Sequence, residues 1–465
     1  MQDSTEKMFI DSWLSYDGLY EISDILEWVK ALNEQTSVSI TKTMLHKTGW
    51  FYEQSSGQIV NNSRSFFQVS GFCQTDTQKK VYREQPIIIQ DEIGYLGILS
   101  KNINGTLHFL MQAKIEPGNI NKIQISPTIQ ATKSNFMQRH GGSKPAYLDY
   151  FVNARSHRVI VDQIQSEQSS RFLKKRNRNI IVMVDDSCTI EESRIHRWMT
   201  LGQIKRLMRF DNLVNMDTRT VLSNIPFQFN LDTLKNISEA RIADNALFRS
   251  IIEGGQSLAS TNIYNHINDY KMYSMCTGEL VPLFSLKNWS TDVLGDVEEF
   301  HDNFQSPFKV IFCDISIDGR EVRNWGQPLL EAIGIATFGL FTTVDEGVRY
   351  FLVRTIPEIG CFDSLELGPT VQVEAGHEDM SPITDLFFRK YRDNDGVMYN
   401  VKLSEEGGRF YHEQNNNVII EIGMGDLPKL PESYFWLTYN TLNRFVQINN
   451  CLNIQLRNLL SLLEL

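Results

Sequence analysis

Residues 174–178 are the part of this chain whose residue types most directly suggest chemistry. Four of these five residues are cationic: Lys174, Lys175, Arg176 and Arg178. Because an arginine guanidinium can bind two phosphate oxygens at once, such a cluster in an acidic protein suits a small polyanion such as a diphosphate. The alternative interpretation is a solvated, charged face of the protein.

A second polar group lies in residues 108–132. Apolar and polar residues alternate on both sides of Pro117, Gly118 and Asn119, which is the pattern of two strands joined by a turn. If the strands pair as a hairpin, a loop with an odd number of residues puts both polar sets on one face, and we expect such a loop. That face is either a solvated sheet surface or the wall of a site. It would carry four residues: Lys114, Glu116, Gln130 and Thr132.

The same stretch occurs twice in the chain. At an offset of 242, Glu116, Gly118, Pro127, Thr128, Gln130 and the upstream Gln85 return as Glu358, Gly360, Pro369, Thr370, Gln372 and Gln327. Farther along the offset is 238, and the 17 residues from Ser166 match those from Ser404 at seven positions. Unrelated sequences would match at roughly one position, so the chain contains an internal duplication that covers most of its length.

The two copies differ in charge. The basic residues 174–178 correspond to residues 412–416, which include no permanent cation. Three further positions change chemistry between the copies: Lys114 becomes Ile356, Thr132 becomes Glu374, and Asp217 becomes Gln455. The sequence therefore predicts that the amino-terminal copy carries the richer site.

The duplication also predicts the domain organisation. We expect a first domain at 1–224, a linker at 225–262 and a second domain at 263–465. Short alternating strands mixed with amphipathic helices indicate an α/β fold of the α+β type, with a mixed or antiparallel sheet flanked by helices in each copy. We expect one helix at about 24–34, capped by Ser23, and another at about 434–463.

Composition and motifs exclude several classes of protein. The chain has 45 basic and 56 acidic residues, a net charge of −11 and a pI near 5.4, which argues against a protein devoted to nucleic-acid polymers or anionic membranes. No signal peptide and no run of 18 apolar residues are present, so we expect a soluble, cytoplasmic protein. The scattered cysteines and histidines predict no metal site, and no nicotinamide, P-loop, zinc-protease or serine-esterase motif occurs.

Five segments resemble the nucleotide-diphospho-hexose 2,3-dehydratase family. They are QAKIEPGN (112–119), ISPTIQATKSNF (125–136), QSEQSSRFLKKRNRN (165–179), WMTLGQ (198–203) and DNLVNMDTRTVL (211–222). The resemblance implies tandem Nudix-like domains, a homodimer, and one working pocket beside one vestigial pocket. The chain differs from the family pattern at Ser169 and Ser170, where glycine is usual. It also lacks the Nudix box of clustered glutamates.

The resemblance also implies a reaction. Such enzymes remove the C2 hydroxyl of a dTDP-4-keto-6-deoxyhexose to give a 3,4-diketo-2,6-dideoxyhexose for deoxysugar biosynthesis. The C4 ketone acidifies the proton on C3, so β-elimination needs a base, an acid and donors to the enolate, but no external cofactor. A downstream NAD(P)H-dependent 3-ketoreductase is expected to consume the product.

Site residues follow from this chemistry as expectations. Lys114, Glu116 and Glu167 are assigned to proton transfer, with base and acid left open, and Arg171, Lys175, Arg176 and Arg178 to the diphosphate. Six polar residues would hold sugar hydroxyls or brace the pocket: Gln130, Thr132, Asn135, Asn215, Asp217 and Arg219. Tyr147 could stack on the nucleobase, although core packing is the commoner role of a single aromatic residue.

Two rival functions stay open at this point. One is a Nudix-type hydrolase of nucleotide sugars, which would release a nucleoside monophosphate in the presence of magnesium. The other is a non-catalytic nucleotide-sugar binding protein, which would leave its ligand unchanged.

Alanine substitutions at the two lysines should separate chemistry from binding. Lys114→Ala is expected to lower kcat, because this lysine is assigned to proton transfer, whereas Lys175→Ala should mainly raise KM, because it is assigned to the diphosphate. Steady-state kinetics on the keto sugar nucleotide measures both constants. Equal, small effects from the two substitutions would contradict these assignments.

Overall fold

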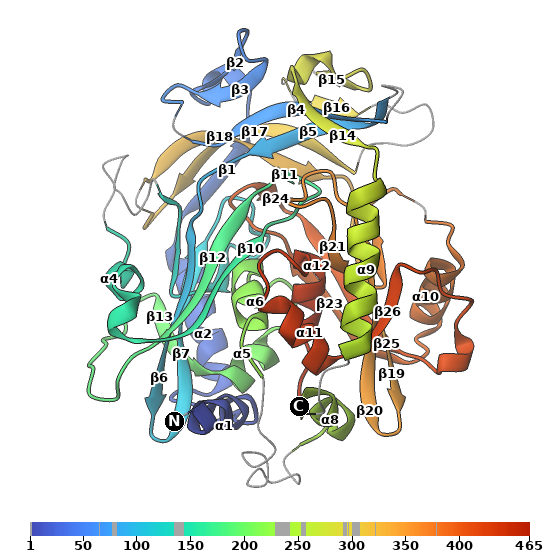
Figure 1. Cartoon of the computed structure of the whole chain (residues 1–465). Coiled ribbons are helices and arrows are strands. Elements are labelled where there is room, and N and C mark those ends of the chain that lie inside the picture. Colours follow the sequence, from blue (N-terminus) through green and yellow to red (C-terminus); the bar gives the residue numbers. More distant parts are fainter. Residues whose placement is uncertain are drawn as a thin grey trace.

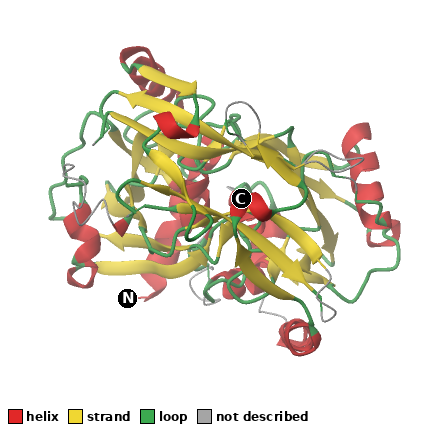
Figure 2. Ribbon diagram, turned by 90° about the horizontal axis from the view of Figure 1, so that it is seen from above, coloured by secondary structure: helices red, strands yellow, loops and turns green. Residues whose placement is uncertain are grey.

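The computed structural model describes most of the 465-residue chain. The described residues are 2–64, 66–76, 81–133, 144–227, 242–252, 257–291, 295, 297–299, 307–320, 322–377 and 379–465. Their strands form four β-sheets, two in the lower part of the molecule and two stacked across its top (Figure 1). Seen from above, helices lie at both flanks of the strand layers (Figure 2).

The two lower sheets are built on the same plan. The lower N sheet has the order β10-β12-β6-β7-β13, with β8 added to β7 and β9 added to β6. Its strands are β6 (Tyr95–Ile103), β7 (Thr106–Ile115), β8 (Ile123–Ser126), β9 (Ile129–Ala131), β10 (Arg158–Ser166), β12 (Arg176–Met183) and β13 (His196–Thr200). The lower C sheet has the order β21-β20-β19-β25-β23, with β22 on β19 and β26 on β20. Its strands are β19 (Ala336–Asp345), β20 (Val348–Ile356), β21 (Glu366–Gly368), β22 (Val371–Val373), β23 (Val397–Ser404), β25 (Gln414–Glu421) and β26 (Tyr434–Thr438).

The two upper sheets exchange one strand with each other. The upper N sheet contains β2 (Trp50–Glu53), β3 (Gln58–Asn61), β4 (Gln68–Thr75), β5 (Val81–Ile89) and β11 (Phe172–Leu173). The upper C sheet contains β15 (Trp289–Thr291), β16 (Val297–Glu299), β17 (Phe308–Ile317), β18 (Asn324–Ala332) and β24 (Phe410–Tyr411). Strand β1 (Val38–Lys42) leaves the first half to pair with β17, and β14 (Thr277–Val281) leaves the second half to pair with β4. Backbone hydrogen bonds therefore tie the halves together in both directions.

A close backbone contact explains why two glycines recur in the duplication. Gly118 N donates to Gly407 O at 2.7 Å, and Gly360 N donates to Ser169 O at 2.8 Å. A Cβ on Gly118 would lie 1.6 Å from the carbonyl oxygen of Phe410, and a Cβ on Gly360 would meet its counterpart in the other half at 1.9 Å. Only glycine allows this approach, which brings the loop after β7 against the segment around β24.

Helices cover the lower sheets and fill the space between them (Figure 1). They are α1 (Gln2–Trp13), α2 (Ile22–Gln35), α4 (Leu148–Val152), α5 (Leu201–Leu207), α6 (Met216–Ser223), α8 (Asn245–Ile252), α9 (Ser257–Tyr273), α10 (Pro382–Asp393), α11 (Tyr439–Val446) and α12 (Ile454–Ser461), with 3-10 turns η1 (Leu45–Lys47), η2 (Ala154–Ser156), η4 (Leu283–Ser285) and η5 (Met424–Asp426). Helices α6 and α12 pack on each other, and each begins at an asparagine cap, Asn215 or Asn453. The main hydrophobic core includes residues of both halves, among them Val221 and Leu456.

Several sequence expectations are confirmed. The expected helix near 24–34 is α2, but Ser23 lies inside it and is not its cap, because the helix begins two residues earlier with Glu21 as the capping residue. Asn215 and Asn453 are corresponding residues of the two copies. Strands β7 and β8 pair as a hairpin, and their loop, residues 116–122, has an odd number of residues. None of the cysteines forms a disulfide, although Cys276 is exposed and not buried as expected. The described part of 225–262 includes α8, which packs on β20.

The second hairpin strand is shorter than the alternation suggested. It ends at Ser126, and residues 129–131 form β9, which pairs with β6 and not with β7. The reason is Thr128, whose hydroxyl accepts from Leu99 N at 2.9 Å and donates to Leu110 O, so one side chain bridges β6 and β7. A threonine that replaces backbone hydrogen bonds in this way allows the chain to cross between strands.

The expectation of one helix at about 434–463 is wrong. The segment forms β26, α11 and α12. Thr438 and Asn453 cap the two helices, and Asn450 between them has φ +56°, which a helix cannot accommodate. Apolar residues at helical spacing did not reveal these interruptions.

The Gly118 contact gives a stability prediction. Gly118→Ala should lower the free energy of unfolding by more than ~3 kcal/mol, because the new methyl group overlaps backbone that cannot move independently. Gly425→Ala is the matched control, since a Cβ there meets nothing within 4 Å. Thermal unfolding measures both variants. Equal melting temperatures for the two would contradict the tight contact.

Candidate active site

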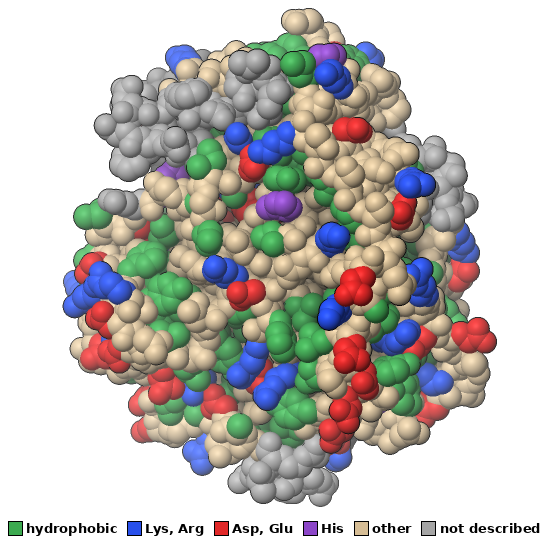
Figure 3. All heavy atoms as spheres, turned by 180° about the vertical axis from the view of Figure 1, so that it is seen from behind, with side chains coloured by type: hydrophobic (Ala, Val, Ile, Leu, Met, Phe, Trp, Pro, Cys, Tyr) green, Lys and Arg blue, Asp and Glu red, His purple; other side chains and the backbone are tan. Residues whose placement is uncertain are grey.

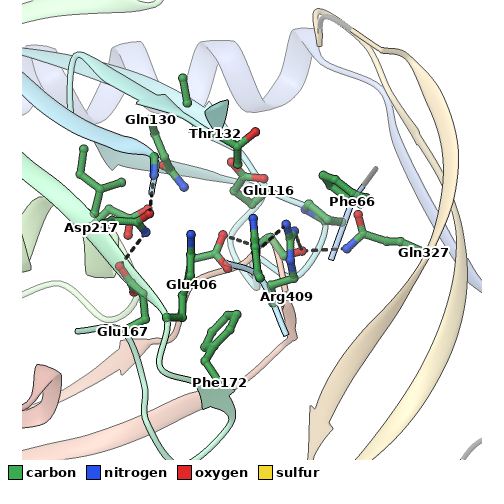
Figure 4. Close-up of a pocket in the computed structure, with 18 of the residues that line it drawn as sticks. Phe66, Glu116, Gln130, Thr132, Glu167, Phe172, Asp217, Gln327, Glu406 and Arg409 are labelled. Atoms are coloured by element: carbon green, nitrogen blue, oxygen red, sulfur yellow. Dashed lines mark hydrogen bonds between the residues drawn. The ribbon is translucent and has the colours of Figure 1, made fainter. Parts of the chain in front are cut away.

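A cavity of about 430 Å³ lies where the lower N sheet faces the upper C sheet. The first half contributes Trp50, Phe66, Gln90, Lys114, Glu116, Gln130, Thr132, Glu167, Phe172, Lys175, Asn177 and Asp217. The second half contributes Arg320, Val322, Trp325, Gln327, Glu406, Gly408 and Arg409. Figure 4 shows Glu116, Glu167, Asp217 and Glu406 around one region of this cavity, with Gln327 and Phe66 toward the other side. Both halves of the chain therefore build one site.

Lys114 and Glu116 form an ion pair at the end of β7. Lys114 Nζ lies 2.8 Å from Glu116 Oε1, and Arg320 Nη1 lies 3.2 Å from the same oxygen. Burial alone would raise the pKa of Glu116, but Arg320 and Lys114 together lower the pKa to about 2. Such a carboxylate stays ionised. Its surroundings favour a role in positioning the two cations more than the role in proton transfer that the sequence suggested.

Three other carboxyls in the cavity have the opposite shift. Burial raises the pKa of Glu406 to about 7 and raises the pKa of Glu167, where Arg457 and Lys175 oppose it. Burial, followed by the carboxyls of Glu167 and Glu406, raises the pKa of Asp217 well above its usual value. The cavity thus holds carboxyls that can carry protons at neutral pH.

Two buried cations lie beside these carboxyls. Burial lowers the pKa of Lys175 to about 8, and its ammonium donates to Glu92 O. Arg409 donates to Gly408 O at 2.8 Å and to Gln90 Oε1 at 3.2 Å, and burial lowers its pKa. Lys175 and Arg409 are near enough to interact electrostatically, so they could share an anionic ligand.

Aromatic residues line another part of the cavity. Trp50 Nε1 donates to Gly326 O at 2.8 Å, and Trp325 Nε1 donates to Gln327 Oε1 at 2.8 Å. Phe66 is half-buried and covers the Arg409 guanidinium, whose carbon lies 4.8 Å from the ring centroid. These hydrogen bonds fix two indole rings at the cavity wall, where a planar ligand group could lie on them.

Half of the residues expected from the sequence lie in this cavity. They are Lys114, Glu116, Gln130, Thr132, Glu167, Lys175 and Asp217. Six others do not line it: Tyr147, Arg171, Arg176, Arg178, Asn215 and Arg219. Asn135 lies outside the described residues.

Arg171 lies in the corresponding site of the second half. Its guanidinium is buried and forms an ion pair with Glu374 at 2.7 Å. Its counterpart Arg409, from the second half, occupies the cavity with Lys114. The duplication did reveal that Arg171 and Arg409 correspond, but the sequence suggested only Arg171 as a ligand. Arg409 lines the cavity and Arg171 does not, because the halves cross over.

Four more expected ligands have other partners. Arg178 forms an exposed ion pair with Asp162 at 2.6 Å, and the guanidinium carbon of Arg176 lies 3.8 Å from the ring centroid of Phe362. Tyr147 donates to Glu191 O at 2.8 Å and is therefore placed away from the cavity wall. Asn215 caps α6 and donates to Gln130 Oε1 at 3.4 Å.

Arg219 holds the halves together. It is fully buried and donates to Val214 O at 2.6 Å and to Ser404 O, in the other half, at 2.7 Å. Its counterpart Arg457 donates to Ser166 O. These arginines therefore brace the loops that carry Glu405 and Glu167.

The second half has a related but acidic site. Here Glu374 pairs with Arg171, and Gln372 donates to Glu358 at 2.8 Å. Burial raises the pKa of Glu358 to about 7, that of Glu405 to about 8 and that of Glu413 to about 7. The position of Lys175 is taken by Glu413, and that of Lys114 by Ile356. Buried carboxyls therefore dominate this second site, whereas the cavity contains Lys114, Lys175 and Arg409 beside its carboxyls.

The comparisons with known proteins agree with this architecture. The model of the NDP-hexose 2,3-dehydratase family matches the chain twice, at residues 22–225 and 260–463. The chain belongs to this family of dehydratases. The resemblance seen in its sequence is thereby confirmed, and the paired matches confirm the repeated layout, whereas the Nudix-like relationship stays a prediction.

Three relatives carry the same name, dTDP-4-dehydro-6-deoxy-alpha-D-glucopyranose 2,3-dehydratase. The protein from Saccharopolyspora spinosa is 36% identical over 98% of this chain and 94% of its own length. Those from Streptomyces violaceoruber and Amycolatopsis orientalis are 35% and 34% identical, over 91% and 89% of this chain and 92% and 83% of their own lengths.

Figure 3 shows one outer face of the molecule, on which basic and acidic side chains are interspersed. Within the described ranges, no group of three or more His, Cys, Asp or Glu side chains is arranged to hold a metal ion. No helix among those residues is both long enough and apolar enough to cross a membrane.

The acidic second site predicts a pH-dependent stability. The pKa of Glu405 is raised by burial from 4.5 to about 8, so the folded protein keeps a proton that the unfolded chain releases between these values. The free energy of unfolding should therefore fall as the pH rises through this window. Glu405→Gln should reduce the fall by roughly 1 to 3 kcal/mol. Urea unfolding at about pH 6 and about pH 8 measures it, and unchanged pH dependence in the variant would contradict it.

Proposed function

We propose that this chain removes water across C2 and C3 of a dTDP-4-keto-6-deoxyhexose and releases a 3,4-diketo-2,6-dideoxyhexose nucleotide. The observation that carries the proposal is the composition of the cavity, where buried carboxyls with raised pKa values lie beside lysine and arginine. Family membership and the names of the relatives support the substrate class. The product belongs to deoxysugar biosynthesis.

The reaction requires proton transfers and no change of oxidation state overall. A carboxylate takes the C3 proton, and the bonding electrons move onto the C4 oxygen as an enolate. The enolate then re-forms the ketone, a C2–C3 double bond develops, and the C2 hydroxyl leaves with a proton as water. The resulting enol at C3 becomes a ketone when C2 is protonated. Positioned acids and bases supply about 10²- to 10⁴-fold each in such reactions.

Lys114 is suited to stabilise the enolate. Its ammonium lies at the cavity wall, 2.8 Å from Glu116 and 3.2 Å from Gln130 O, which leaves its third proton for a ligand. The Glu116 carboxylate keeps it charged and fixed in place. A donor held in this way to a developing oxyanion contributes roughly 3 kcal/mol.

The rest of the cavity suggests how the nucleotide lies. The sugar would occupy the region of Lys114, Glu167 and Asp217, and the diphosphate would lie near Lys175 and Arg409. The base would then reach the aromatic wall formed by Trp50, Phe66 and Trp325. This order of groups matches the sequence sugar, diphosphate, base in the substrate.

Incubation with dTDP-4-keto-6-deoxyglucose tests the proposal. Mass spectrometry should detect loss of one water per substrate molecule, with the labile diketone trapped by a reductant. Release of thymidine monophosphate with magnesium would instead indicate a hydrolase, and an unchanged ligand bound by the protein would indicate a non-catalytic binding protein. Either result overturns the proposal.

We also propose a homodimer and an NAD(P)H-dependent 3-ketoreductase as the next enzyme. The product is a vicinal diketone and is prone to rearrange in water, so rapid reduction would preserve it. Light scattering of the purified protein and coupled turnover with such a reductase address the two points.

A further inference from the structure

The two copies of the duplication differ at two positions in the same chemical sense. Asp217 in the first copy corresponds to Gln455 in the second, and Glu406 in the second corresponds to Gln168 in the first. Each pair sets a carboxyl against an amide: Glu406 and Gln168 have the same shape, and Gln455 is one methylene longer than Asp217. One of these two acids is in the first copy and the other is in the second, so neither copy has the carboxyl at both positions.

The exchange between the halves places both acids in one cavity. Asp217 lies in the first turn of α6, and Glu406 lies in the loop between β23 and β24, yet both line the cavity with Lys114 (Figure 4). Both amides are fully buried elsewhere: Gln168 lies beside Glu413 in the second site, and Gln455 lies in the first turn of α12. The carboxyl-for-amide difference therefore follows the cavity and not the copy.

The other acids of the cavity do not show this difference. Asn177 donates to Glu167 at 2.7 Å, and the same contact recurs between Asn415 and Glu405 at 2.5 Å. Glu116 likewise recurs as Glu358. A group that is present in both sites is explained by the shared fold, whereas a group confined to one site is explained by the work of that site.

We infer that Asp217 and Glu406 are the acid–base pair of the dehydration: Glu406 takes the proton from C3, and Asp217 gives a proton to the departing C2 hydroxyl. This assignment rests on the proposed function and deepens it. It replaces Glu116 and Glu167, the carboxyls that the sequence suggested for proton transfer.

The surroundings of the two carboxyls fit these separate roles. Gly408 N donates to Glu406 Oε1 at 2.8 Å, and the Arg409 guanidinium is close enough to attract this carboxyl. Both interactions favour the carboxylate, the form that a base needs. Burial and the carboxyls of Glu116 and Glu167 oppose them, so the pKa of Glu406 is raised to about 7 and a large fraction of this group is ionised at neutral pH. The charged groups that act on Asp217 are mainly the carboxyls of Glu167, Glu406 and Glu116, and only Lys114 opposes them. These neighbours, together with burial, favour the protonated form of Asp217, the form that a general acid needs.

The proton balance closes over one turnover. Glu406 gains the C3 proton, and Asp217 loses one to the hydroxyl, which leaves as water. The C3 hydroxyl of the enol then gives up its proton as C2 gains one, and the two carboxyls return to their starting states through solvent. No oxidant or reductant takes part.

Exchange of the C3 hydrogen in deuterium oxide tests the two roles separately. Asp217→Asn should lower water loss by roughly 100-fold or more but still exchange the C3 hydrogen, because the base is intact. Glu406→Gln should neither eliminate water nor exchange the C3 hydrogen, because the base is removed. Nuclear magnetic resonance of the keto sugar nucleotide follows exchange, and mass spectrometry follows water loss.

Controls keep the outcome interpretable. Glu405→Gln makes the same change one residue earlier in the chain, in the second site, and should leave both rates within about threefold of the unsubstituted enzyme. If an amide variant melts early, Asp217→Glu and Glu406→Asp keep a carboxyl and should recover part of the rate with a shifted pH profile. Exchange by Glu406→Gln at the normal rate, or normal water loss by either amide variant, overturns the pair. Failure of the unsubstituted enzyme to release water overturns the proposed function instead.

Discussion

A backbone hydrogen bond that leaves no room for a side chain determines how the two halves of this protein meet. Gly118 and Gly360 each donate to a carbonyl of the opposite half, and a Cβ on either would overlap the carbonyl of Phe410 or Phe172. The exchanged strands β1 and β14 add further backbone hydrogen bonds between the two halves. Because these bonds are directional and buried, the loops that carry Glu406 and Arg409 have one position, which is against the end of β7.

That junction changes the electrostatics of the site. A carboxyl on the surface would ionise below neutral pH, but Asp217 and Glu406 are closed in by both halves, so desolvation raises their pKa values. Glu116 shares the same cavity and shows the opposite shift, since Lys114 and Arg320 contact it directly. Neighbouring carboxyls can thus hold different protonation states at one pH because their partners differ.

The duplicated fold offers two such sites, and the charges distinguish them. In the second site, Arg171 forms an ion pair with Glu374, and Glu413 occupies the position of Lys175 in the first site. The buried carboxyls of Glu405 and Glu413 there have raised pKa values although Arg171 lies close to both, which favours neutral acids over an anion-binding surface. A fold that builds each site from both halves lets one site keep the cations and proton carriers while the other loses them.

The sequence by itself determined the duplication, the mixed α and β character, the family resemblance and half of the residues expected at the site. Alternation and offsets are local properties, so they revealed Lys114, Gln130, Lys175 and Asp217. They could not show that β1 pairs with β17, since pairing between distant strands leaves no periodic signal. Only the tertiary structure decided that Arg409 and not Arg171 belongs with Lys114, because the exchange between halves is a matter of long-range contacts and of the space left by two glycines.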